Sequence, residues 1–273
     1  MRGASRASLA ELTARLREVL PARDAPTAAG PVADGLFAVV HLLDREHALR
    51  RALSDPAKPP AEKAAVAEAL LTGKVPSEVA GLTANAVRHR WSGPRDLPDA
   101  LEETAVRALI IGADAAGQLD DVEDELFRFG RVVAAEPALR AALADPALPR
   151  ERKRDLVAAL LEGKATPATL RLVTEAAQYP RGRSLEASLD AYARLAAQQR
   201  ERLVAVVRTA TELSAAQRDR LTAALARIYG RDVHLNVVLD PEVIGGLSVK
   251  IADDVIDGTV AGRLETVRRR LGA

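Results

Sequence analysis

The sequence predicts a mainly helical protein that ends in a small α+β domain. Alanine, leucine and arginine are abundant and aromatic residues make up only 3% of the chain, a composition that favours helix-on-helix packing over a β-sandwich. Apolar residues recur at helical spacing through the first two thirds, where proline and glycine separate short segments. The pattern changes near Arg202, and the segments that follow predict the order β-α-β-β-α. At 273 residues, the chain is long enough for one domain or two.

Composition and charge remove several classes of function. The 39 basic and 38 acidic residues give a net charge of +1, which argues against a main surface that binds nucleic acid. The absence of cysteine excludes disulfides, thiolate catalysis and cysteine-bound zinc. No apolar run approaches the roughly 20 residues that span a bilayer, and the charged N-terminal segment does not resemble a secretory signal. We therefore expect contact with a membrane only through a partner.

The first expected element is a helix that Ser5 or Ser8 caps and that continues through Leu20. Because Pro21–Pro31 is rich in proline and small residues, this segment predicts a loop.

An internal repeat follows, at an offset of 90 residues. Val32–Lys74 aligns without gaps on Val122–Lys164, and nearly half of the aligned positions are identical. Matched Pro, Gly and Lys positions make chance a poor explanation in a chain rich in Ala and Leu, so the repeat indicates a duplicated helical unit. In each copy a helix is expected to end at a C-cap glycine, Gly73 or Gly163.

The repeat sets the predicted domain boundaries. We expect an N-terminal helical bundle over residues 1–95 and a second bundle over residues 96–202, and a connecting helix could be common to both. A C-terminal α+β domain is expected over residues 203–273.

The elements of the C-terminal domain are predicted one by one. Leu203–Ala210 is β-rich, Val233–Leu239 alternates and Leu247–Ile251 is the next strand. Ser214 and Gln217 form a capping box for a helix that runs from Ala215 to Tyr229.

Two further features of this domain predict turns. Gly245 and Gly246 are expected to adopt a positive φ between strands. The acidic residues after the third strand are expected to form a turn and to cap a final helix rather than to bind a cation; they are Asp253, Asp254 and Asp257.

The common catalytic and ligand-binding motifs are missing from the sequence. The four histidines do not have metal-ligand spacing, and neither a phosphate-binding G-x-x-x-x-G-K-[ST] loop nor a G-x-S-x-G motif occurs. We therefore predict no catalytic residue, no metal site and no cofactor. Trp91, the single tryptophan, is expected in the core at the edge of a bundle.

The segment LDPEVIGGLSVKIADDVIDGTVAGRL, Leu239–Leu264, resembles the C-terminal signature of the delta subunit of bacterial F-type ATP synthases, the family of the mitochondrial oligomycin-sensitivity-conferring protein. Ala252 stands where glycine is usual and Thr259 where serine is usual. The layout matches from about Leu101 to the end, whereas the first hundred residues are an additional, diverged bundle. The signature positions that also shape the backbone are Asp240, Gly245, Gly246, Asp257, Gly258 and Leu264.

This resemblance implies a non-catalytic stator subunit in the peripheral stalk of a proton-translocating ATP synthase, present once per complex at the cytoplasmic face of the cell membrane. Its partners would be the N-terminal helices of the alpha subunits and the C-terminal segment of the b subunit, and it would resist rotor torque. By analogy, a groove for a partner helix is expected between Leu101–Ile111 and Leu170–Tyr179. Its candidate residues, each of which could instead serve internal packing, are Leu101, Ala105, Leu109, Leu170, Val173 and Ala177.

Two other classes of function stay open at the level of sequence. A helical-repeat adaptor in another assembly would use the first bundle as its main docking module. An enzyme would need a buried acidic or histidine constellation that the sequence does not reveal.

Overall fold

The computed structural model describes residues 3–21, 23–200, 203–229, 233–241, 243, 245–251 and 254–257. The chain forms two compact units, a helical unit (Met1–Gln199) and a C-terminal unit (Arg200–Ala273). The prediction of a mainly helical chain with a small C-terminal α/β part is confirmed.

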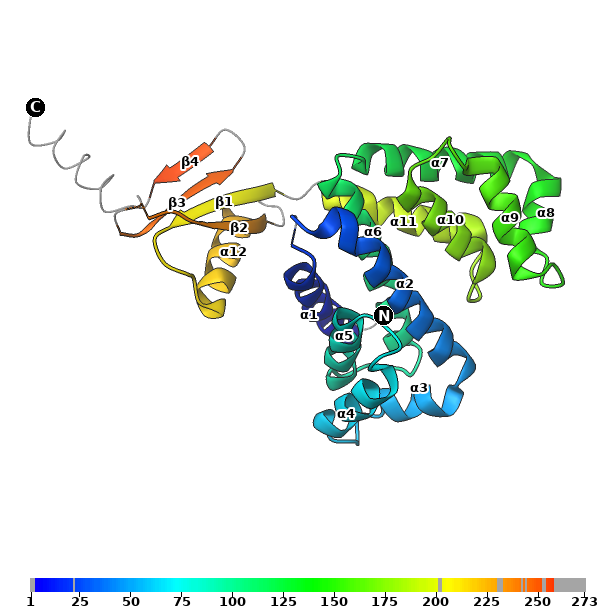
Figure 1. The fold of residues 1–273 in the computed structure, drawn as a ribbon, viewed down its shortest axis with the longest axis horizontal. Helices are drawn as coiled ribbons and strands as arrows, with labels where there is room; N and C mark the ends of the chain where they lie inside the picture. The colour runs from blue at the N-terminus through cyan, green and yellow to red at the C-terminus, as the bar shows by residue number, and fades with distance from the viewer. Residues whose placement is uncertain are drawn as a thin grey trace, which may run out of the picture. The chain divides into compact units, whose positions relative to one another are not determined.

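Short loops join the helices of the helical unit (Figure 1). In chain order its described helices are α1 (Gly3–Val19), α2 (Ala25–Arg45), α3 (His47–Ser54), α4 (Pro60–Leu71), α5 (Ser77–Arg88), α6 (Asp96–Ala115), α7 (Leu119–Ala135), α8 (Pro137–Ala144), α9 (Arg150–Leu161), α10 (Pro167–Gln178) and α11 (Leu185–Arg200). Gly73 and Gly163, which follow α4 and α9, have φ of 74° and 71°, so the predicted glycine caps are confirmed.

The duplication is visible in the way the helices pack. Within the first set of helices, α1 packs on α5, α2 on α3 and α5, and α4 on α5. The second set repeats these contacts, because α6 packs on α10, α7 on α8 and α10, and α9 on α10. The first set also packs against α6, through α1, α2, α3 and α5. Thus α6 is the first helix of the second set and also completes the packing of the first set.

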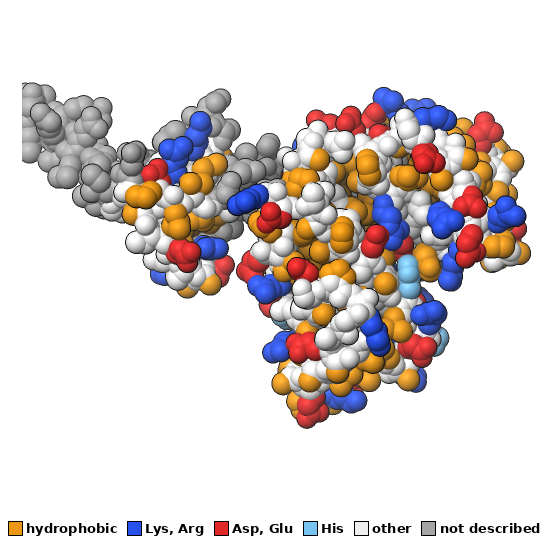
Figure 2. Space-filling model, viewed as in Figure 1, with side chains coloured by type: hydrophobic (Ala, Val, Ile, Leu, Met, Phe, Trp, Pro, Cys, Tyr) orange, Lys and Arg blue, Asp and Glu red, His pale blue; other side chains and the backbone are white. Residues whose placement is uncertain are grey.

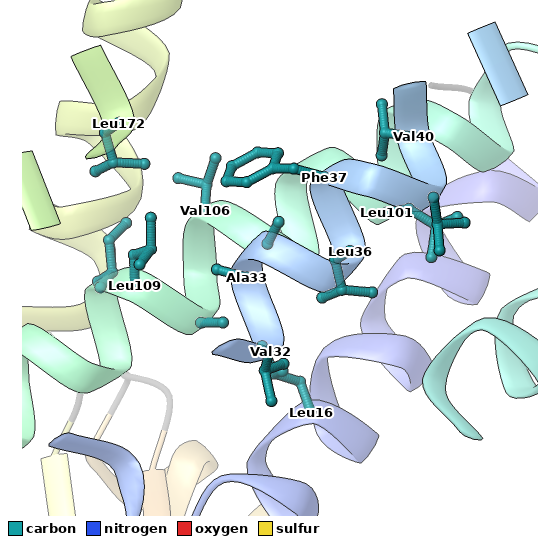
Figure 3. Packing of buried hydrophobic residues seen from close by; sticks show 14 of the residues in the cluster. Leu16, Val32, Ala33, Leu36, Phe37, Val40, Leu101, Val106, Leu109 and Leu172 are labelled. Atoms are coloured by element: carbon teal, nitrogen blue, oxygen red, sulfur yellow. The ribbon is translucent and has the colours of Figure 1, made fainter. Parts of the chain in front are cut away.

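A single apolar core runs through the helical unit, from Leu12 to Ala196. Its largest helix–helix contact is between α2 and α6, and Figure 3 shows Leu36 and Phe37 of α2 beside Leu101 and Val106 of α6. The boundary predicted between residues 95 and 96 coincides with the start of α6. Because helices on both sides of it share this core, the division into two bundles stays a prediction about the repeat.

The helix α2 starts inside the segment that the sequence assigned to a loop. Pro26 lies in the first turn, where its missing N–H costs no hydrogen bond, whereas Pro31 lies inside the helix. Burial of Ala25 and Ala29 to 0% and 3% exposure offsets the cost of the internal proline. Contrary to expectation, this 21-residue helix is long and apolar enough to cross a membrane, but half of its apolar window is buried within the unit, as in a core helix.

The C-terminal unit has a four-stranded sheet in the order β2-β1-β3-β4. Strand β1 (Leu203–Thr209) pairs in parallel with β2 (Val233–Leu239), and α12 (Ala215–Tyr229) connects them. Strand β3 (Leu247–Ile251) is antiparallel to β1. A small core of its own includes Ala205, Val207, Leu225, Val233, Val249 and Ile251.

The predicted acidic turn is wrong for Asp254 and Asp257, because both lie in an additional strand, β4 (Asp254–Asp257). It pairs antiparallel with β3, and Ile251 lies opposite Asp254. The intervening apolar pair Val255 and Ile256 gives this short segment the character of an edge strand. Asp253 and the predicted final helix lie outside the described residues.

Candidate functional site

The six residues predicted to line a partner-helix groove lie mainly in the core of the helical unit. Leu101, Ala105 and Val173 are 0% exposed, and Leu109 and Ala177 are 6% and 2% exposed. Leu170 is half-buried against the same core. Their role as partner contacts therefore stays a prediction, since none of the five buried side chains offers free surface.

The chain's own α2 covers the α6 side of this groove. The two backbones come so close at Gly112 that a Cβ there would lie 2.5 Å from the Cβ of Ala29 and 3.2 Å from the carbonyl oxygen of Ala25. Ala105 is seven residues before Gly112, so it lies on the same face of α6, nearly two turns away. The helix α2 thus packs against the face of α6 on which these candidate residues lie.

The α10 side faces α2 with polar residues rather than with the predicted ones. Arg171, Glu175 and Tyr179 contact α2. Val173, two positions after Arg171, points about 200° round the helix from it, so it faces the interior of the second bundle. Ala177 is related to Glu175 in the same way. The predicted groove residues of α10 thus lie on a different face of this helix from the residues that contact α2.

Arg171 is the centre of the contact between α2 and α10. Its Nε donates to Asp34 of α2 at 2.5 Å and its Nη1 donates to Glu175 at 3.1 Å. The guanidinium also lies over the ring of Phe37, 4.9 Å from the ring centroid. Burial alone would lower the pKa of Arg171, but the hydrogen bond and charge of Asp34 and the charge of Glu175 raise it. The cation therefore holds both helices.

A histidine extends this contact by one turn. His41 of α2 places Nε2 2.6 Å from Oε1 of Glu175, and its ring stacks on Tyr179 with centroids 3.5 Å apart. On the other side, the guanidinium of Arg150 lies 4.4 Å from the centroid of the Tyr179 ring. Both faces of this aromatic ring are thus occupied.

A second ionic cluster lies where α2, α6 and α11 meet. Arg181, in the loop after α10, donates from Nε to Asp44 of α2 at 2.6 Å and from Nη2 to Asp99 of α6 at 2.8 Å. It also donates to Glu102 of α6, a carboxylate that is 5% exposed. Arg181 has a φ of 49°, which costs a residue with a Cβ about 1–2 kcal/mol. Three carboxylates from two helices hold it there. The Arg181 cluster comprises Asp44, Asp99, Glu102, Arg181, Arg183 and Tyr192.

Two members of this cluster, the partly exposed Asp99 and the buried Tyr192, have shifted pKa values. Burial raises the pKa of Asp99, although the charge of Arg181 opposes the shift. Burial, together with the charge of Glu102, raises the pKa of Tyr192 well above its ordinary value of 10.0. The Tyr192 hydroxyl donates to Oε1 of Glu102 at 3.2 Å. This carboxylate also accepts from Arg181 and Arg183, so it is fully engaged in binding the helices together.

The Arg181 cluster forms one wall of a cavity of about 770 Å³. The cavity carboxylates Asp44, Asp99 and Glu102 pair with arginines of the cluster, and Glu103 pairs with Arg107. A carboxylate bound in this way is a poor general base. Within the described residues, no group of three or more His, Cys, Asp or Glu side chains could hold a metal ion. The arrangement therefore suits attachment of helices.

The described signature residues of the C-terminal unit shape its backbone. Gly245 and Gly246 have φ of 66° and 79°, so the predicted need for positive φ is confirmed. Asp240 follows β2, and its N–H donates to the carbonyl of Thr209 at 2.9 Å. Asp257 ends β4. Gly258 and Leu264 lie outside the described residues.

Sequence reasoning missed Arg171, Arg181 and His41, the residues that join the two halves of the helical unit. Their partners in the chain are up to 137 residues away, so no local pattern identifies the pairs. One available signal was Glu102, a carboxylate within the apolar stretch that became α6.

On the visible face in Figure 2, Lys and Arg side chains lie among Asp and Glu side chains over the helical unit. This mixed surface agrees with the formal net charge of +1. It gives a nucleic acid no extended field of positive charge on that face.

Comparisons with known proteins agree on one family. The family model described as ATP synthase delta (OSCP) subunit matches residues 105–271. "ATP synthase subunit delta" of Thermobifida fusca is 51% identical over 99% of this chain and 99% of its own length. "ATP synthase subunit delta" of Streptomyces avermitilis is 51% identical over 99% of this chain and 98% of its own length.

Among solved structures, a chain of the Toxoplasma gondii mitochondrial ATP synthase hexamer covers 62% of this chain at 21% identity, with a TM-score of 0.27. Such a score supports no detailed superposition. The family model starts inside α6, yet both bacterial relatives match almost the whole chain. The additional N-terminal helices are therefore shared with them, and the chain belongs to the ATP synthase delta (OSCP) subunit family.

Proposed function

We propose that this chain is the peripheral-stalk (stator) subunit of a proton-translocating F-type ATP synthase. One observation carries the proposal: the identity of 51% to an ATP synthase delta subunit extends over 99% of both chains. The similarity thus includes the C-terminal unit, the second set of helices and the additional first set. A module borrowed by another assembly would match over part of its length.

In this role the helical unit binds N-terminal helices of the alpha subunits, and the C-terminal unit binds the C-terminal segment of the b subunit. The chain holds no catalytic site of its own and is present once per complex, at the cytoplasmic face of the membrane. Two units with separate cores support this assignment, since each can present its own surface to a different partner.

Resistance to torque requires that the helical unit does not yield between its two sets of helices. The contact of α2 with α6 and α10 supports this, because it combines close packing at Gly112 with the ion pairs of Arg171 and Arg181. Packed interiors have low compressibility and transmit strain. A load applied to one set of helices would therefore reach the other without a hinge between them.

A binding experiment with the full chain tests the proposal. The alpha-subunit N-terminal peptide and the soluble C-terminal segment of the b subunit are each titrated with the purified chain by calorimetry. We expect both to bind, and neither to compete with the other. If the chain binds neither ligand, the stator assignment is refuted. A scrambled alpha-subunit peptide of the same composition is the control.

A further inference from the structure

The duplication contains a second copy of the contact that joins α2 to α10. In the first copy, Asp34 and Phe37 form an Asp-x-x-Phe motif on α2. Both side chains contact one arginine, because Arg171 pairs with Asp34 and lies over the ring of Phe37. Phe37 is 0% exposed, between this arginine and the apolar core that α2 shares with α6 (Figure 3). One turn later, His41 contacts Glu175, which is four residues after that arginine.

The second copy of the motif lies on α7 and is open. Asp124 and Phe127 occupy the equivalent positions, and Phe127 is 58% exposed. Asp124 pairs with Arg128 of its own helix at 2.7 Å, and both side chains are about half exposed or more. In Figure 1, α7 runs along an outer edge of the helical unit.

The position equivalent to His41 is Arg131. Its guanidinium lies 6.0 Å from the centroid of the Phe127 ring, and within the described residues it forms no ion pair. The face of α7 therefore offers a carboxylate, an aromatic ring and a cation in the order and spacing of Asp34, Phe37 and His41.

Internal stability does not account for this face. A single exposed apolar side chain needs no explanation, but here the phenylalanine occurs together with the aspartate that completes the arginine-binding motif. Phe127 is 58% exposed, so the fold gains far less from it than from the fully buried Phe37. In the equivalent place on α2, Phe37 is buried, and Asp34, whose side chain stays 58% exposed, binds Arg171 of α10.

We propose that Asp124, Phe127 and Arg131 form a docking site for a helix of another subunit of the same complex. The partner helix runs parallel to α7, as α10 does to α2, and carries an arginine followed four residues later by Glu or Asp. Its arginine binds Asp124 and covers the ring of Phe127, and its acidic residue binds Arg131. The choice of partner rests on the proposed function, whereas the chemistry of the site rests on the repeat.

Affinity measurements on the full chain test this site. The probes are the isolated catalytic head and the soluble C-terminal segment of the b subunit, titrated separately. Phe127→Ala should weaken binding of one probe about thirtyfold, as expected for a central aromatic contact. Arg131→Glu should weaken binding of the same probe. Val66→Ala, at a 47% exposed position on α4, is the matched control and should bind as the wild type does.

Each outcome decides the question, provided that all four chains unfold at the same urea concentration. If the wild type binds a probe and neither Phe127→Ala nor Arg131→Glu weakens it, the docking site is refuted while the stator function stands. If the wild type binds neither probe, both proposals fall. If Phe127 instead holds two copies of this chain together, so that Phe127→Ala converts a dimer to a monomer, the docking site is also refuted.

Discussion

Replacing Phe37 or Phe127 by alanine should have very different effects on stability, although the two residues occupy the same position of the repeat. Phe37 is 0% exposed and lies under Arg171. Loss of a buried phenylalanine costs about 3–5 kcal/mol, and loss of the cation–π contact adds about 1 kcal/mol. Phe127 is 58% exposed, so less than half of its side chain leaves water on folding. Its replacement should therefore cost less than about 1 kcal/mol.

Trp91 gives a direct assay for this comparison. It is the single tryptophan of the chain, is 5% exposed and donates from Nε1 to the carbonyl of Ala86 at 2.9 Å. Its fluorescence during urea unfolding therefore reports the free energy of unfolding of the helical unit, without interference from the C-terminal unit. If the two variants lose the same free energy of unfolding, or if Phe37→Ala loses less than about 1.5 kcal/mol, then α2 is not packed as described.

Three further changes test the packing of the helical unit. Gly112→Val should lower the free energy of unfolding by about 1–3 kcal/mol or more, because the added side chain pushes α6 away from α2. In the same urea assay, Gly81→Ala, at an open position on α5, should raise the free energy of unfolding by up to about 1 kcal/mol. Because burial raises the pKa of Tyr192 in the folded chain, its stabilising contribution is present below the ordinary value of 10.0 and is lost as the pH rises through the folded pKa. Above pH 10, the unfolding temperature should thus fall more steeply with pH for the wild type than for Tyr192→Phe. Parallel plots of unfolding temperature against pH would contradict the buried environment of Tyr192. Deletion of residues 1–95 should expose the α2-facing side of α6 and give an aggregating chain by light scattering, so a monodisperse, cooperatively unfolding product would show that the core is not shared.

Local features of the fold could be predicted because their causes are local. The capping box is an example: the N–H of Ser214 donates to the Gln217 side chain at 2.8 Å, and the N–H of Gln217 donates to the Ser214 hydroxyl at 3.3 Å. The glycine caps and the Gly245–Gly246 turn depend on backbone conformations that glycine adopts at low cost. Trp91 is buried, as expected for a core residue at the edge of a bundle.

The errors have a common physical origin in contacts that are distant in sequence. Pro31 suggested a loop, but burial of α2 against α6 outweighs its local cost. The role of the groove residues on α6 stays a prediction, and the structure adds that α2 covers the face on which they lie. That this face is covered by α2 depends on the approach at Gly112 and on Arg171, neither of which has a local signal. Strand β4 was missed because a four-residue edge strand has too short a pattern to outweigh two aspartates.

Because α6 packs against both sets of helices, the structure has a consequence for folding during synthesis on the ribosome. Domains begin to fold from the N-terminal side during synthesis. The first five helices cannot bury the inner face of α2 until α6 has emerged, and the second set needs the same helix before it can close. Synthesis therefore leaves a long apolar helix exposed for the time taken to translate residues 46–115, and we expect nascent chains arrested in that interval to bind chaperones most strongly.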